Sequence, residues 1–112
     1  MKPTLYIAGK VTGLPYKEVL NKFKKQEDFF VNKGWEVVNP IKLINNEHME
    51  WDEAMKICIK YMIDCHIVVF LPCYKESKGA MIEFNIAKLL NIPVRFVEAP
   101  ISTESKKINL AP

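Results

Sequence analysis

Short apolar runs recur along the chain, separated by longer stretches in which apolar and charged residues are mixed. The runs lie at Thr4–Ala8, Trp35–Asn39, Ile67–Leu71 and Pro93–Val97. They are rich in Val, Ile, Leu and aromatic residues, and a Gly or Pro stands at or beside an end of each. Runs of this length and composition between chain-breaking residues predict buried β-strands.

The stretches between these runs predict amphipathic helices. The first helix spans Tyr16–Lys33, where apolar residues recur at helical spacing, and Gly34 stops it. The second spans Trp51–Asp64, and the third begins near Ser77 and ends at Leu90. Charged residues fill the remaining positions of the first helix, as on the solvated side of a surface helix.

Between Pro40 and Trp51 the pattern predicts a loop of about ten residues that contains Asn45, Asn46 and His48. A loop of this length exceeds the usual connection in a compact domain. It is expected either to cover a site as a lid or to be a simple excursion over the surface.

The predicted order is strand, helix, strand, helix, strand, helix, strand. Right-handed crossovers then give an α/β fold with a doubly wound, flavodoxin- or Rossmann-like parallel sheet and helices on both faces. We expect about four to five strands in the order 2-1-3-4. Residues 1–97 form this domain, and the polar residues 98–112 form a C-terminal tail.

The composition narrows the class of protein. With 112 residues, 49% of them hydrophobic and 26% charged, the chain is an ordinary globular domain. No apolar run is long enough to cross a bilayer, and no signal-peptide pattern opens the chain. The net charge of +3 is modest and no basic stripe interleaves with aromatic residues, so we expect no membrane and no nucleic-acid partner.

The cysteines are odd in number, at Cys58, Cys65 and Cys73, and form no CxxC pair. We therefore expect reduced, mostly buried thiols in a cytoplasmic protein. Together with His48 and His66 they give no metal-ligand spacing, so neither a metal nor a cofactor is predicted.

In a doubly wound sheet, ligands bind outside the carboxyl ends of the strands where the winding reverses, here strands 1 and 3. The turns that follow these strands are Gly9–Gly13 and Pro72–Gly79. In the first, two glycines flank Lys10 and Thr12, so that backbone N–H groups could approach a phosphate; a plain turn is the alternative. Two turns far apart in sequence thus converge on one predicted crevice.

The second turn leads to a carboxylate. Ser77 and Gly79 suit the start of a helix, where a hydroxyl caps free N–H groups and the dipole attracts an anion. Glu83 lies about one and a half turns further on, flanked by Ala80 and Ala87. It is a candidate functional residue on a small, apolar face. The alternative is an ordinary solvated charge early in a helix.

Three segments carry a family resemblance: Tyr6–Gly13, Glu36–Pro40 and Ser77–Glu83. Together they resemble a small phage and bacterial domain group of unassigned function. That group looks like a branch of the nucleoside 2-deoxyribosyltransferase superfamily, which also includes the 2'-deoxynucleoside 5'-phosphate N-hydrolases. The similarity covers roughly residues 4–97.

The resemblance implies roles for single residues. Glu83 matches the nucleophile that attacks the anomeric carbon and displaces the base, and Tyr6 would orient it. Ser77 resembles the serine of the phosphate-taking hydrolases, where transferases of free nucleosides tend to have an aspartate. The residues implied to line the sugar-phosphate pocket are Gly9, Val11, Thr12, Gly13, Ser77 and Gly79, with Lys10 as the candidate replacement for an arginine that hydrolases carry where Thr12 stands.

A second departure concerns the leaving base. Hydrolases carry an acid in the helix before the third strand, and its place falls at Cys58, which cannot serve as that acid. Substitutes would have to come from Asp52, Glu53 or Asp64.

The first hypothesis is thus an enzyme that cleaves or exchanges the N-glycosidic bond of a nucleotide or deoxynucleoside monophosphate. The alternative is a nucleotide-binding protein that kept the pocket, lost the chemistry and captures a metabolite or signal. A structural dimer without a ligand ranks third.

The second predicted helix also bears on assembly. Its apolar stripe of Trp51, Met55, Cys58, Met62 and Cys65 is widened by Ala54, Ile57, Ile59, Tyr61 and Ile63. This excess predicts a second buried contact, most simply in a homodimer or higher homo-oligomer. The alternative is a helix buried deeply in its own core.

Overall fold

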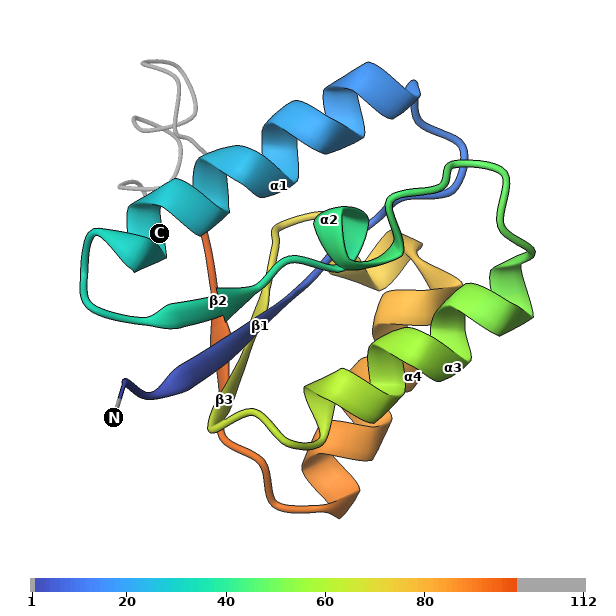
Figure 1. Cartoon of the computed structure of the whole chain (residues 1–112). Helices are drawn as coiled ribbons and strands as arrows, with labels where there is room; N and C mark the ends of the chain where they lie inside the picture. The colour runs from blue at the N-terminus through green and yellow to red at the C-terminus, as the bar shows by residue number, and fades with distance from the viewer. Residues whose placement is uncertain (1, 99–112) are drawn as a thin grey trace, which may run out of the picture.

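A computed structural model describes residues 2–98 of the chain. Of the predicted tail, 98–112, all but Glu98 lies outside the described residues. Figure 1 shows the elements, which in chain order are β1 (Thr4–Ala8), α1 (Tyr16–Val31), β2 (Glu36–Val38), α2 (Pro40–Ile44), α3 (Trp51–Met62), β3 (Ile67–Phe70), the 3-10 turn η1 (Tyr74–Glu76), α4 (Lys78–Leu89) and β4 (Val94–Phe96).

The strands form one four-stranded sheet in the order β2-β1-β3-β4, and all neighbouring pairs are parallel. Leu5 of β1 is in register with Val37 of β2 and with Ile67 of β3. The predicted α/β class, strand order and parallel sheet are therefore confirmed. β1 matches its predicted bounds, and the other predicted strands and helices differ by one or two residues at their ends.

The sheet is covered on both faces (Figure 1). Alternate strand residues point to opposite sides, so that each face has its own core cluster. The α1 face consists of Leu5, Ile7, Val69 and Leu71 under Val19, Phe23 and Phe30 of α1 and Ile41 of α2. The α3/α4 face consists of Tyr6, Ala8, Val68 and Phe70 under Cys58, Met62, Ala80 and Ala87.

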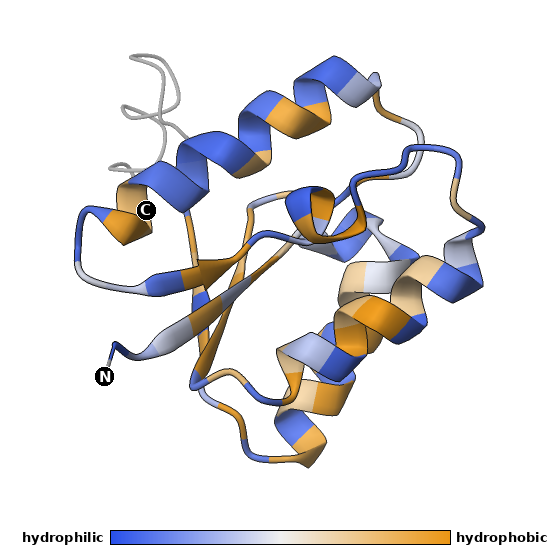
Figure 2. Cartoon of the chain, in the orientation of Figure 1, coloured by the Kyte–Doolittle hydropathy of each residue, from blue (hydrophilic) through white to orange (hydrophobic). Residues whose placement is uncertain are grey.

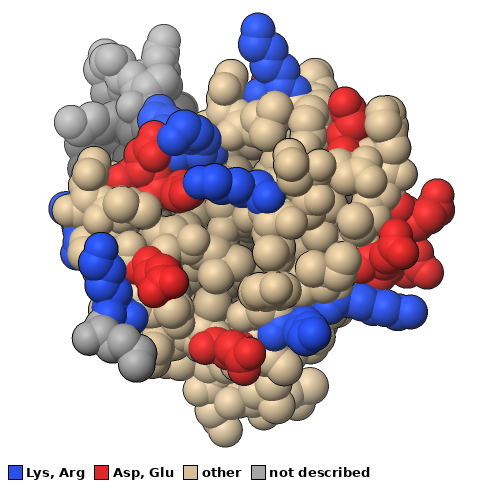
Figure 3. Space-filling view, in the orientation of Figure 1, with Lys and Arg blue, Asp and Glu red and all other residues tan. Residues whose placement is uncertain are grey.

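Hydropathy follows this layering. Figure 2 shows α1 as largely hydrophilic with separate hydrophobic patches, whereas much of the sheet is hydrophobic. This is the distribution expected of a helix that buries one stripe against a sheet. In the face seen in Figure 3, basic and acidic side chains are interspersed around the edge.

The segment after Pro40 corrects the sequence analysis, because the predicted loop begins with the helix α2. Asn39 caps it by accepting a hydrogen bond from the N–H of Ile41 at 3.0 Å. Pro40 takes the first helical position, where its missing N–H costs nothing. Asn45 ends the helix in the left-handed conformation, with φ of 49°. Such a short helix has too few turns to produce a periodic pattern.

The apolar excess on α3 is only partly absorbed by the core. Cys58 and Met62 are buried, but Tyr61 is 48% exposed and Ile63, just after the helix, is 43% exposed. The alternative that this helix is buried deeply in its own core is therefore wrong for Tyr61 and Ile63. Within residues 2–98, no helix has the length and apolar character needed to span a membrane.

Candidate functional site

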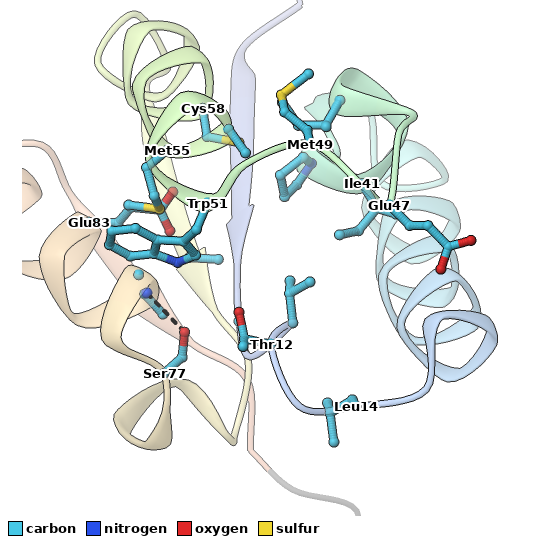
Figure 4. Close-up of a pocket in the computed structure, with 18 of the residues that line it drawn as sticks. Thr12, Leu14, Ile41, Glu47, Met49, Trp51, Met55, Cys58, Ser77 and Glu83 are labelled. Carbon is cyan, nitrogen blue, oxygen red and sulfur yellow. Dashed lines mark hydrogen bonds between the residues drawn. The ribbon is translucent and has the colours of Figure 1, made fainter.

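A cavity of about 380 Å³ opens at the carboxyl end of β1. This volume lies in the range of small-molecule sites, about 300–1,000 Å³. Its walls come from the turn after β1, from α2, α3 and their connection, and from the start of α4 (Figure 4). The cavity therefore lies at the strand ends where a doubly wound sheet binds its ligands.

The two predicted turns meet in this cavity. The predicted residues that line it are Tyr6, Gly9, Val11, Thr12, Gly13, Ser77, Gly79 and Glu83. Lys10 instead lines an adjoining hollow, which shares Thr12, Ser77 and Gly79 with the cavity. The structure thus brings together side chains that lie some sixty or more residues apart in the sequence.

Tyr6 and Glu83 form the polar floor of the cavity. The Tyr6 hydroxyl donates a hydrogen bond of 2.6 Å to Oε2 of Glu83. Tyr6 is 1% exposed and Glu83 is 5% exposed. The alternative of an ordinary solvated charge is therefore wrong for Glu83.

The second carboxylate oxygen of Glu83 has a different environment. Among residues 2–98 no side chain or backbone group donates a hydrogen bond to Oε1, and this oxygen is not sealed from solvent. Since Glu83 lines the cavity, Oε1 is the oxygen that a ligand can reach. One oxygen is thus fixed by the protein and the other is free.

Burial changes the acidity of this pair. Desolvation raises the pKa of Glu83 to about 7, and the hydrogen bond from Tyr6 opposes the increase. Desolvation, together with the nearby Glu83 carboxylate, raises the pKa of Tyr6 well above its ordinary value. Tyr6 therefore keeps its proton and remains a donor to Glu83 at neutral pH.

The start of α4 forms the second polar part of the site. Ser77 caps the helix by accepting a hydrogen bond of 3.1 Å from the N–H of Ala80, as predicted (Figure 4). The N–H groups of Lys78 and Gly79 lie in the first turn, where N–H groups have no intrahelical partner. With the Ser77 hydroxyl, they form a set of donors suited to an anion.

Glycine suits the local geometry at two positions of the walls. A Cβ at Gly79 would lie 2.9 Å from Sδ of Met55, so the small residue lets α3 approach the start of α4. Gly13 has φ of +89°, a conformation that other residues rarely adopt. Both glycines therefore shape the cavity through the backbone.

Lys22 of α1 holds the two turns together from outside the cavity. Its ammonium group donates a hydrogen bond of 2.7 Å to the carbonyl oxygen of Lys10 and lies 3.3 Å from Sγ of Cys73. Lys10 itself pairs with Glu76 at 3.4 Å across the adjoining hollow. Lys78 lies over the ring of Trp51, 4.7 Å from its centroid.

The apolar part of the cavity wall was not predicted from the sequence. Its members come from α2, α3 and the segment between them, namely Pro40, Ile41, Ile44, Met49, Trp51, Ala54 and Met55. The signal in the sequence is the broad apolar surface of the second predicted helix, which by itself indicates a core or a dimer contact. Trp51, Met55 and Cys58 of the apolar stripe line the cavity, and of the additional apolar residues Ala54 does. The predicted loop contributes Asn46, Glu47 and Met49, so it borders the site, and its action as a lid stays a prediction.

Cys58 lies in the cavity wall at the position expected for an acid. It is buried, and desolvation raises the pKa of its thiol to about 11. The suggested substitutes Asp52, Glu53 and Asp64 are exposed, and none of them lines the cavity. Within the described part of the chain, no three His, Cys, Asp or Glu side chains are grouped to hold a metal ion.

A family model described as a domain of unknown function (DUF4406) matches residues 3–96. The match spans every strand and helix described above. No curated protein and no solved structure matches the chain. The description of the family names no activity, so the function is argued from the site.

Proposed function

The chain belongs to the DUF4406 family of domains of unknown function, and we propose that it cleaves or transfers the N-glycosidic bond of a small nucleotide, with Glu83 as nucleophile. The observation that carries this proposal is the free oxygen of a buried, tyrosine-bound carboxylate facing a cavity. A nearby cluster of anion donors at the start of α4 supports a phosphate-bearing substrate.

In the proposed reaction, Oε1 of Glu83 attacks the anomeric carbon and the bond to the base breaks. The transition state has oxocarbenium character, which a neighbouring carboxylate stabilises before it forms the glycosyl-enzyme. Water or a second base then releases the sugar and regenerates the carboxylate. Tyr6 holds Oε2 throughout, so that Oε1 keeps its direction.

The phosphate would bind to the Ser77 hydroxyl and to the N–H groups of Lys78 and Gly79. Ser77 accepts a bond from Ala80 and keeps its own hydroxyl hydrogen for a phosphate oxygen. Lys10 and Lys78 border the adjoining hollow together with one acidic residue, Glu76, so basic side chains outnumber acidic ones near the same donors. This supports the resemblance to the 5'-phosphate N-hydrolases more than to enzymes of free nucleosides.

The test is to incubate the protein with a panel of ribo- and deoxyribonucleoside monophosphates and to measure the free base by chromatography. Glu83→Gln is expected to abolish release, whereas Glu18→Gln, an exposed glutamate of α1, serves as the matched control. Because the pKa of Glu83 is about 7, the rate is expected to rise as pH increases through about 7. Equal release by wild type and Glu83→Gln would refute the proposal.

A second candidate function is nucleotide capture without chemistry. The thiol of Cys58, at the position where relatives would carry the leaving-group acid, favours it. In that case no base is released, and wild type and Glu83→Gln both retain a nucleoside monophosphate in equilibrium dialysis. The same panel of nucleotides therefore distinguishes the two functions.

We also propose that the protein works as a homodimer. The exposed Tyr61 and Ile63 support a second contact surface at the end of α3. Sedimentation equilibrium measures the assembly, and Tyr61→Lys is expected to shift a dimer toward monomer. A wild-type protein that stays monomeric at high concentration would rule this out.

A further inference from the structure

The free oxygen of Glu83 faces mostly apolar side chains. Figure 4 shows Met55, Cys58 and Trp51 on the wall near Glu83. Of the described carboxylates, Glu83 and Glu47 line the cavity, and Glu47 is an exposed residue that directs its carboxylate away from the other labelled side chains (Figure 4). A buried carboxylate in such surroundings is stabilised by a positive partner. The lysines nearby, Lys10 and Lys78, border the adjoining hollow instead.

The polar groups beside Glu83 are a phenol and a thiol, and both hold their protons. The Tyr6 proton is already donated to Oε2. The Cys58 thiol, whose pKa is raised to about 11, is a weak acid at neutral pH. A neutral purine or pyrimidine leaves as an anion unless it is protonated, and a positioned acid typically contributes 10²–10⁴-fold to such a step. A base that can leave without being protonated therefore fits a site in which neither the Tyr6 phenol nor the Cys58 thiol readily releases a proton.

Resting on the proposed function, we infer that the preferred substrate is an N-ribosylpyridinium nucleotide, in which a positively charged aromatic ring nitrogen is bonded to the anomeric carbon. Its positively charged ring nitrogen lies across the anomeric carbon from the free oxygen of Glu83, its planar ring contacts apolar side chains of the cavity, and its 5'-phosphate binds at the start of α4. The positive aromatic ring then matches the apolar lining around the Glu83 carboxylate, and the phosphate matches the N–H and hydroxyl donors at the start of α4.

The step balances without an added acid. The Oε1–carbon bond forms as the carbon–nitrogen bond breaks, and the bonding pair neutralises the pyridinium nitrogen. The neutral pyridine departs and leaves a ribosyl ester on Glu83. Water then attacks the anomeric carbon, its proton passes to solvent, and the carboxylate is restored.

The experiment compares nicotinamide mononucleotide with adenosine monophosphate, which share the ribose 5'-phosphate and differ in the base. The wild-type protein is assayed for free nicotinamide and free adenine, and release by Glu83→Gln is subtracted as background. We expect kcat/KM for nicotinamide release to exceed that for adenine by about 100-fold or more.

The outcomes separate the two proposals. Adenine release as fast as nicotinamide release would overturn the substrate inference and leave the glycosidase function standing. Release of neither base above the Glu83→Gln background, with cleavage of another nucleotide in the panel, would also overturn only the substrate inference. Release of no base from any nucleotide would overturn both.

Position 58 provides a further test of the leaving-group argument. Cys58→Asp introduces an acid beside the Tyr6–Glu83 pair, so adenine release is expected to gain more than nicotinamide release and the preference should narrow at least tenfold. Cys58→Ser is the size-matched control and is expected to keep a larger preference. An unchanged preference in a folded Cys58→Asp would contradict the inference, and thermal unfolding verifies the fold. If Cys58→Asp does not fold, the wild-type comparison still decides.

Discussion

The two faces of the sheet are built from neighbouring residues of the same strands, yet their contents differ. The core cluster of the α1 face is built from apolar side chains such as Ile7, Val19 and Phe23. The α3/α4 face buries the phenol of Tyr6, the carboxylate of Glu83 and the thiol of Cys58 beside its apolar residues. One face is closed by packing, and the other opens into the cavity at the strand ends.

The two faces therefore differ in what they contribute to stability and to function. Burying Glu83 costs free energy, as its raised pKa indicates, and its hydrogen bond with Tyr6 recovers only part of that cost. The core cluster of the α1 face contains no carboxylate, and the buried Asn39 beside it is paired with Glu27 of α1 at 3.1 Å. We infer that the α1 face supplies the stability that allows the α3/α4 face to keep a polar group in place for a ligand.

The largest effect is expected on the α1 face. Phe23 is fully buried, so Phe23→Ala should lower the free energy of unfolding by about 3–5 kcal/mol. Phe29, on the same helix, is 50% exposed, and Phe29→Ala should cost less than about 1 kcal/mol. Urea unfolding measures both. The division between the faces would fail if a folded Phe23→Ala shifted the pKa of Glu83 in an NMR titration.

The next effect is a pH dependence from the α3/α4 face. Burial raises the pKa of Glu83 from 4.5 to about 7, so the folded protein holds this proton more tightly than the unfolded chain. The resulting stability is present below about pH 4.5 and is lost as pH rises through about 7. The full loss is on the order of 3 kcal/mol.

Urea unfolding at about pH 5 and about pH 8 measures this loss, with pH values chosen on either side of the folded pKa. Glu83→Gln should lack the part of the pH dependence that comes from Glu83. The difference in pH dependence between wild type and variant therefore separates the Glu83 contribution from that of other titrating groups such as the histidines. A wild-type protein whose pH dependence matches that of Glu83→Gln would mean that Glu83 is not buried in solution.

A smaller effect is expected at the hydrogen bond itself. Tyr6→Phe leaves the carboxylate without its donor, which should cost about 1–3 kcal/mol when Glu83 is ionised and less when it is protonated. The pKa of Glu83 should rise above about 7, because the Tyr6 bond lowers it. Carbon NMR of labelled glutamate measures the shift. An unchanged pKa would show that Tyr6 does not control the site.

The smallest effect on stability is expected at the start of α4. Ser77→Ala removes the cap on the Ala80 N–H and should cost about 1 kcal/mol. Ser77→Asp preserves a capping oxygen and most of the stability, but its charge should repel a phosphate. Weaker binding of a nucleoside monophosphate to Ser77→Asp, measured by calorimetry, would sharpen the assignment of this end of the cavity. Unchanged binding would mean that the phosphate does not bind at the start of α4.

Much of the site could be predicted because its residues follow from strand order. Once β1 and β3 are neighbours, the turns that follow them must lie at one edge, and Glu83 follows Ser77 at a fixed helical distance. The apolar wall could not be found in this way. Trp51 and Met55 lie on a helix whose pattern does not distinguish residues facing a core from residues facing a cavity. The helix α2 was too short to leave a period in the sequence.

The sequence by itself determined the strands, their order and the point where the chain gathers its polar groups, because local periodicity and crossover handedness leave few alternatives. Only the tertiary structure decided that the Glu83 carboxylate is buried, bound by Tyr6 through one oxygen and open through the other. The physical reason is that burial and acidity depend on side chains brought together from β1, α3 and α4, and no one segment contains that information.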